Sequence, residues 1–171
     1  MGVCINFSGQ LKSAGHFAHL ERVGRRWAKH WKCDLNEVEH PSFPFFRVVN
    51  DEVMEVSGPM RGLTLHPHPE CESVRLFFNK ELYLDHWCKT QFAPPDTHVE
   101  VCAFLRDIEP LFDGFNVIDD GGFWETGDRA ELERRLGFLN RMIDRIGTGL
   151  EAKGHKVQRR GEGEPPRSSM N

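Results

Sequence analysis

The interval at which apolar residues recur changes twice along this chain, and this change constrains the fold more than any other feature. Residues 132–146 place leucine and isoleucine at alternating intervals of four and three, as one face of a helix requires. Between residues 41 and 92 the helical spacing is absent, and short apolar runs separated by turn residues take its place. A chain that changes period in this way is expected to form an α+β domain.

Three helices are predicted. The first covers residues 14–32, the second begins at Pro94 and Pro95, and the third begins near Asp128. In each helix, apolar side chains three and four positions apart form one stripe that we expect to be buried on a sheet. The stripes are Leu20, Val23, Trp27 and Trp31 in the first helix, Val101, Phe104, Leu105, Ile108 and Leu111 in the second, and Leu132, Leu136, Leu139, Ile143 and Ile146 in the third.

Seven short runs have the composition of strands. They are residues 3–7, 45–49, 52–56, 62–66, 74–78, 82–87 and 115–119. The predicted order is strand, helix, five strands, helix, strand, helix, which gives a mainly antiparallel sheet of six to seven strands with three helices packed on it. Residues 1–150 are expected to form one globular domain. Residues 151–171 offer little to bury, so we expect a disordered tail there.

Charge and cysteine usage narrow the class of protein. The 171 residues carry a formal net charge of −4, so no overall attraction for nucleic acid is expected. No apolar run approaches the length of a membrane span, and the first residues lack the pattern of a signal peptide. The five scattered cysteines include no CxxC pair, which argues against a disulfide framework. A soluble cytoplasmic domain is therefore expected.

The segment HPHPECE, residues 66–72, is the sharpest candidate for a metal site. Side chains two apart on an extended chain share a face, so His66, His68, Glu70 and Glu72 could converge. The two prolines would hold the segment extended before an ion arrived. Imidazole and carboxylate ligands suit zinc, iron, manganese or nickel. A stiff polar loop is the alternative, because the buried face of the flanking runs changes parity across the segment.

The spacing of His66, His68 and Glu72 resembles the first metal motif of the cupins, HxHxxxE. That resemblance would imply a β-barrel that holds Mn, Fe or Zn in an oxygenase, an isomerase or a simple binding protein. It covers seven residues, lacks the flanking glycines of the motif and has no second motif elsewhere in the chain. Three helices also do not fit a small barrel. We therefore treat the similarity as coincidental.

Two polar positions near the second helix are further candidates. His98 stands at the start of that helix, either as another metal ligand or as a hydrogen-bonded histidine of the core. Just before it, the polar run of Lys89, Thr90 and Gln91 could bind a carboxylate or a phosphate. The alternative for this run is an ordinary polar strand end without a function.

The loop DDGGFWETGD, residues 119–128, joins a strand to a helix, where ligands are often bound. Its acidic side chains suit a cation, and Asp119, Asp120 and Glu125 are candidate catalytic groups. Trp124 is a candidate binding residue, or else a packing anchor. The structural alternative is a tight turn in which Asp119 accepts hydrogen bonds from backbone amides.

Two functions are compatible with the sequence. We first expect a non-catalytic domain that binds a partner protein or a small ligand through a sheet face and exposed aromatic residues such as Trp87, Phe123 and Trp124. The alternative is a small metal-dependent hydrolase or oxygenase that uses HPHPECE, with an acid from residues 119–125 activating a metal-bound water. A cleft shared by HPHPECE, His98 and the acidic loop would favour the enzyme.

Overall fold

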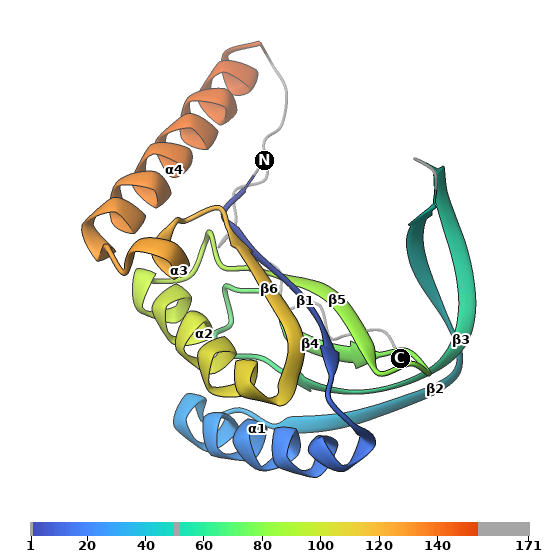
Figure 1. Cartoon of the computed structure of the whole chain (residues 1–171). Coiled ribbons are helices and arrows are strands. Elements are labelled where there is room, and N and C mark those ends of the chain that lie inside the picture. The colour runs from blue at the N-terminus through green and yellow to red at the C-terminus, as the bar shows by residue number, and fades with distance from the viewer. Residues whose placement is uncertain (1, 50–51, 154–171) are drawn as a thin grey trace.

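The computed structural model describes residues 2–49 and 52–153 (Figure 1). These residues form an α+β structure with two three-stranded antiparallel sheets. Sheet A has the order β5–β1–β6, and its strands are β1 (Cys4–Leu11), β5 (Tyr83–Lys89) and β6 (Phe112–Asp119). Sheet B has the order β2–β3–β4, and its strands are β2 (Leu35–Val49), β3 (Glu52–Leu65) and β4 (Val74–Phe78).

Four helices accompany the sheets, and two of them complete the core. The helices are α1 (Phe17–Trp31), α2 (Pro95–Ile108), α3 (Phe123–Thr126) and α4 (Arg129–Ala152), and short 3₁₀ turns lie at Ala14–His16 and Glu109–Leu111. The apolar sides of α1 and α2 share one buried cluster with the inner faces of both sheets. Phe7, Phe78 and Phe104, one each from sheet A, sheet B and α2, are among its largest fully buried side chains.

The strands differ from the sequence prediction in number and in arrangement. The structure has six strands in two sheets, in place of one sheet of six to seven strands. The predicted runs 52–56 and 62–66 form a single strand, β3, because the chain passes Gly58-Pro59 without a turn. Pro59 lies opposite a β-bulge between His40 and Phe43 and is not paired with a residue of β2. Its missing N–H group therefore costs the ladder no hydrogen bond. The short helix α3 was not predicted.

A turn at Asn79 carries the chain from sheet B to sheet A. Its side-chain Oδ1 atom accepts hydrogen bonds from the amides of Glu81 and Tyr83, both at 3.0 Å, as asparagine commonly does in turns. The break predicted at Asn79-Lys80 is therefore confirmed, but the strands on its two sides belong to different sheets. The other predicted tight turn, Asn50-Asp51, lies outside the described residues.

The large apolar side chains of the helix α4 are buried along its first half only, although Gly147 in the second half is also buried. As predicted, Asp128 caps the start of α4. The Asp128 carboxylate accepts hydrogen bonds from the amides of Ala130 and Glu131 at 2.9 and 3.1 Å. Leu132 and Leu136 are buried against Val3. The second half projects from the body (Figure 1) and leaves five large apolar side chains 40–59% exposed. We call this set the helix patch: Phe138, Met142, Ile143, Ile146 and Leu150. The expectation that the whole stripe is buried was therefore wrong for Ile143 and Ile146.

The predicted tail, residues 151–171, lies almost entirely outside the described residues. Its first two residues complete α4, which ends at Ala152. Over residues 2–49 and 52–153, no helix combines the length and the apolar character needed to cross a bilayer.

Candidate functional site

Three elements bring Thr90, His98 and Asp119 together inside the molecule. Thr90 directly follows β5, His98 lies in the first turns of α2, and Asp119 ends β6. Asp119 is paired with Ile5 in the ladder between β6 and β1, and Ile5 is fully buried. Because directly opposed residues project from the same face of a sheet, the Asp119 side chain also points into the core. Prolines start α2 within a few residues of Thr90, which places His98 near the ends of both strands.

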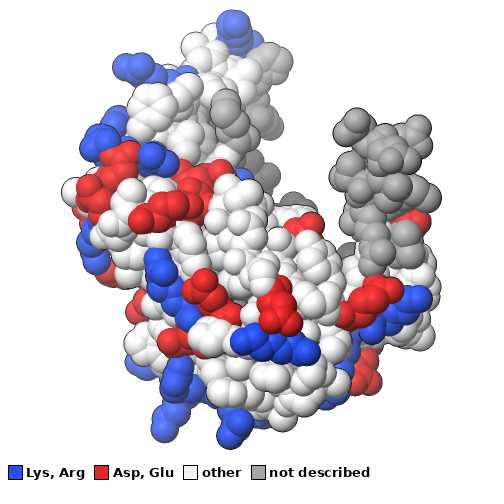
Figure 2. All heavy atoms as spheres, viewed as in Figure 1, with Lys and Arg blue, Asp and Glu red and all other residues white. Residues whose placement is uncertain are grey.

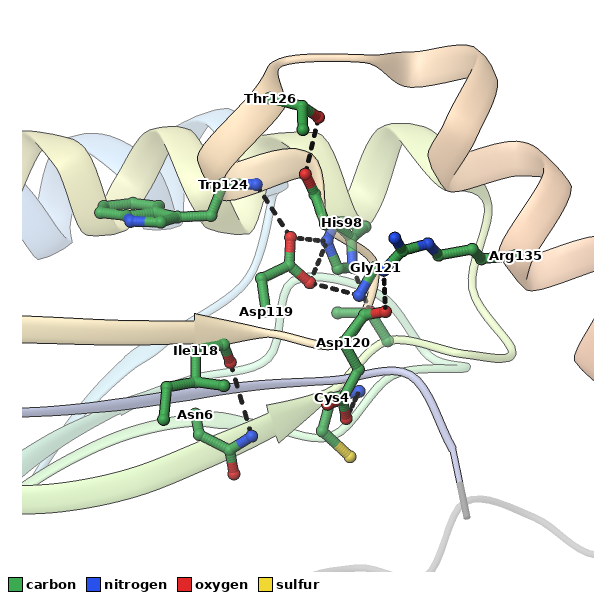
Figure 3. Close-up of polar contacts among 12 residues, drawn as sticks. Cys4, Asn6, His98, Ile118, Asp119, Asp120, Gly121, Trp124, Thr126 and Arg135 are labelled. Carbon is green, nitrogen blue, oxygen red and sulfur yellow. Dashed lines mark hydrogen bonds and ion pairs between the residues drawn. The ribbon is translucent and has the colours of Figure 1, made fainter.

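The imidazole of His98 has a partner at each of its nitrogen atoms. Its Nδ1 atom lies 2.7 Å from the hydroxyl oxygen of Thr90. Its Nε2 atom lies 3.1 Å from the Asp119 carboxylate (Figure 3). His98 and Thr90 have no exposed surface, and Asp119 is 7% exposed. The group is therefore a buried hydrogen-bonded network rather than a row of separate side chains.

The Asp119 carboxylate is held in the interior as an anion. Its two oxygens accept hydrogen bonds from the amides of Gly121 at 2.6 Å and of Trp124 at 2.9 Å, in addition to the contact with His98. Burial alone would raise the pKa of the Asp119 carboxyl, but the hydrogen bonds and the nearby imidazole outweigh this effect and lower the pKa. The backbone contacts are those of the tight turn proposed as the structural alternative for this loop.

Cys102 completes the cluster and was not predicted as a site residue. It lies four positions after His98 on α2, so the two side chains share one face of the helix. One ligand atom from each of His98, Cys102 and Asp119 lies within 4.8 Å of the other two. Burial raises the pKa of the Cys102 thiol, and the Asp119 carboxylate raises it further. The spacing of four between His98 and Cys102 is the sequence signal that could have identified the pair.

Gly121 lets the loop after β6 approach the imidazole closely. A Cβ atom added to Gly121 would lie 2.9 Å from His98 Nε2 and 2.7 Å from Leu132 Cδ1, which is too close for either neighbour. The following residue, Gly122, has a φ of +74°, a conformation that favours glycine. The glycine pair is therefore required by the path of the loop around His98.

The other predicted residues of the acidic loop lie apart from His98. Asp120 is exposed, and its carboxylate accepts a hydrogen bond from the Cys4 amide at 3.2 Å. Glu125 is exposed on α3. Trp124 is partly buried, and the Arg106 guanidinium lies 4.1 Å from the centre of one of its rings, which suits the packing anchor proposed for it. Of the three predicted acids, Asp119 is thus the one that contacts His98.

HPHPECE turns back on itself. The amide of Cys71 donates a hydrogen bond to the His68 carbonyl at 3.0 Å, which closes a turn over Pro69 and Glu70. The His68 ring takes part in this turn, because its Nδ1 atom accepts a hydrogen bond from the Glu70 amide at 3.1 Å. Side chains of a turn do not alternate about one line, so the predicted shared face of the histidines and glutamates is not formed. The segment has the geometry of the polar loop that was its alternative.

The remaining polar groups of this loop have separate partners. His66 Nδ1 lies 3.0 Å from the hydroxyl of Ser73, and the Glu72 carboxylate accepts a hydrogen bond from the Lys89 amide at 3.3 Å. Among the residues that the structure describes, the two histidines and two glutamates belong to no group of three ligand atoms close enough to share an ion. The metal ligands predicted in HPHPECE are therefore not brought together with His98.

Two buried cysteines, Cys71 and Cys88, contact the backbone of the same loop. The Sγ atoms of Cys71 and Cys88 lie 3.2 Å from the carbonyl oxygens of His68 and Glu72, respectively. The proximity of the two thiols lowers the pKa of Cys71 and raises that of Cys88, and burial raises the pKa of Cys88 further. The loop is thus attached to β5 through sulfur and backbone groups, while its histidines lie closer to solvent.

The polar run before His98 does not act as one unit. The Lys89 ammonium lies 5.3 Å from the centre of the Phe92 ring, and Lys89 is partly exposed. Gln91 is 1% exposed, and neither atom of its amide group has a hydrogen-bond partner among the described residues. Thr90 contacts the His98 imidazole. The structure therefore places one of these three predicted binding residues in the buried cluster.

The burial of the cluster limits the reactions that it could perform. His98, Thr90 and Cys102 are at most 1% exposed, so they offer a substrate no surface on which to bind. The convergence that would have favoured a hydrolase or oxygenase is partial: His98 meets Asp119, but His66 and His68 have other neighbours. A buried imidazole, thiol and carboxylate can instead hold a charge or a small ion.

Two adjoining hollows lie on the surface near the bend of the β2–β3 hairpin. Their volumes are about 480 and 240 Å³, and both are lined by Pro59, Asn79 and Lys80. None of the site residues predicted from the sequence lines either hollow. The two hollows therefore share no lining residue with the buried cluster.

Comparisons with known protein families, with curated protein sequences and with solved structures find none that matches this chain.

Proposed function

We propose that the chain is a non-catalytic protein-binding module and that the helix patch is its contact surface. The observation that carries this proposal is the exposure of five large apolar side chains on the projecting half of one helix. Figure 2 shows the projecting part of α4 as uncharged surface with basic side chains at its margins. A contiguous apolar surface of this kind is typical of a site that a partner covers.

The spacing within α4 supports a helix as the partner. Apolar residues continue at intervals of four and three from the packed half of the helix into the projecting half. The repeat consists of Leu132, Leu136, Leu139, Ile143, Ile146 and Leu150. An interval that averages 3.5 residues is the pattern of a coiled-coil seam, which receives the side chains of a second helix. The first part of this seam, at Leu132 and Leu136, is buried against the rest of the domain. The part at Ile143, Ile146 and Leu150 is exposed and is free to pack against a second helix.

The partner that we propose is α4 of a second copy of this chain. Coiled coils select foreign partners through charges at the positions beside the seam. Beside the exposed seam these positions are uncharged, so two copies can approach each other without repulsion between like charges. They are Asn140, Met142, Gly147 and Gly149.

The outer face of sheet A supports a binding function independently. Tyr83, Trp87 and Ile118 are 39%, 49% and 58% exposed. Trp87 and Ile118 are both paired with Asn6, one on each side of β1, so they form a row across the sheet. Trp87 and this sheet face belong to the contact surface expected from the sequence. We propose that they bind a further protein segment.

Sedimentation analysis of the full chain tests the proposal. We expect reversible association in the micromolar range. The double variant Ile143→Asp/Ile146→Asp should be monomeric, because it places charges in the seam. The matched control Arg141→Asp/Thr148→Asp adds the same number of aspartates to the opposite side of α4 and should associate like the wild type. A wild-type chain that stays monomeric at 100-fold higher concentration, or a seam variant that still associates, would contradict the proposal.

A further inference from the structure

We propose that His98, Cys102 and Asp119 form a buried zinc site that fastens α2 to the end of β6. The three ligand atoms lie within 4.8 Å of one another, and the His98 Nε2 atom is 3.1 Å from the carboxylate. Two atoms bound to one zinc ion at about 2.0–2.3 Å are separated by roughly 3.2–3.8 Å. The imidazole and carboxylate are therefore already spaced as ligands, and a shift of at most about 1 Å at the thiol completes the set.

The chemistry of the three side chains selects the metal. Magnesium and calcium prefer ligand sets made of oxygen, so a thiolate argues against them. Imidazole, thiolate and carboxylate are the three ligand types that zinc accepts in proteins. Three side chains leave a fourth position, which we assign to the second Asp119 oxygen, because both carboxylate oxygens lie 3.1 Å from His98 Nε2 and a structural zinc site has no open position.

The ligands balance an ion of charge 2+ once the Cys102 thiol has lost its proton. Asp119 contributes one negative charge, and the Cys102 thiolate contributes a second, so the occupied site is neutral overall. A neutral site is far less costly to bury than a lone carboxylate. On zinc binding, the thiol proton leaves to solvent and sulfur takes the metal in its place. His98 Nε2 then binds the ion, and Nδ1 carries the imidazole proton and donates it to Thr90 Oγ1.

Neighbouring groups hold the ligands in the orientation that a metal site needs. The Nδ1 atom of His98, on the side of the ring away from Asp119, lies 2.7 Å from Thr90 Oγ1. The Asp119 oxygens accept hydrogen bonds from the amides of Gly121 and Trp124. In metal sites the second nitrogen of a histidine ligand almost always has such a partner, and ligand carboxylates are likewise hydrogen-bonded. Because His98 and Cys102 are at most 1% exposed, we assign the ion a structural role.

Cobalt substitution tests the site in the full chain, purified without a metal resin and stripped with a chelator. Cobalt bound by a thiolate gives a charge-transfer band in the near ultraviolet, and tetrahedral cobalt gives visible bands. We expect one equivalent of cobalt to produce both, and zinc to displace cobalt and raise the melting temperature. Cys102→Ser should abolish the charge-transfer band. The matched control His66→Ala/His68→Ala, which alters the other histidines considered as ligands, should leave the band unchanged.

Two further measurements keep the proposal testable if Cys102→Ser does not fold. Thr90→Val should retain the charge-transfer band while weakening metal affinity about 10- to 100-fold, because it removes the partner of His98 Nδ1. X-ray absorption of the zinc-loaded wild type should give one sulfur ligand, with nitrogen and oxygen atoms for the rest. Absence of the band and of any zinc-dependent rise in melting temperature overturns the proposal. So does a zinc ion with two or more sulfur ligands, which would place it at the other cysteines.

Discussion

The Nε2 atom of His98 lies 3.1 Å from the Asp119 carboxylate, and neither side chain is exposed to solvent. This contact joins the first turns of α2 to the last residue of β6. A buried charged group is tolerated when each of its oxygens has a partner, and the amides of Gly121 and Trp124 supply those partners here. Removing one member of such a network leaves the others buried without a partner, which is the costly case.

Asp119→Asn should destabilise the metal-free protein by about 2–4 kcal/mol, measured as the free energy of unfolding in urea at pH 7. The amide can replace only one carboxylate oxygen as an acceptor, so one buried donor loses its partner. Asp120→Asn is the matched control, because Asp120 is the adjacent residue and is exposed. An asparagine at this position can still accept the hydrogen bond from the Cys4 amide. It should change stability by less than about 0.5 kcal/mol. Equal effects of the two substitutions would show that the buried contact contributes little.

The contribution of Asp119 to stability should depend on pH. Its pKa is lowered in the folded protein, so the unfolded chain binds the proton more readily. The stabilisation is therefore fully present above the ordinary carboxyl pKa of about 3.9 and is lost as the pH falls through the lower folded value. The difference in unfolding free energy between the wild type and Asp119→Asn should shrink below about pH 4. A difference that stays constant from pH 7 to pH 2 would argue against an ionised Asp119 in the core.

Local features of the fold could be predicted from the sequence. The stripe of α1 contains Leu20 and Val23, and both are buried as expected. Asp128 caps α4 as its position before an apolar repeat indicated. These predictions succeeded because helix periodicity and capping depend on residues within a few positions of one another. The division into two sheets could not be predicted in this way, because it depends on which distant strands pair.

The buried cluster illustrates the same limit. Asp119 reaches His98 because β6 pairs with β1 in a register that aligns Asp119 with Ile5, more than 100 residues earlier in the chain. No local pattern specifies that register. HPHPECE shows the opposite error, since regular spacing suggested convergence where His68 and Cys71 instead close a turn. The pattern of four between His98 and Cys102 was present but is too common on amphipathic helices to indicate a site by itself.

A second histidine, His86, should make stability fall as the pH is lowered from about 6.5 to 4. Burial lowers its pKa to about 4, and the positive charge of Arg75 adds to this effect. The unfolded chain therefore takes up a proton in this interval while the folded protein does not, which favours unfolding as the pH falls. His86→Phe keeps an aromatic ring against Phe77, whose ring centre lies 5.2 Å from that of His86. This variant should have a flatter pH profile between pH 6.5 and 4, measured by urea unfolding, and a constant offset from the wild type above pH 7. Parallel profiles over the whole range would mean that His86 becomes protonated in the folded protein as readily as in the unfolded chain.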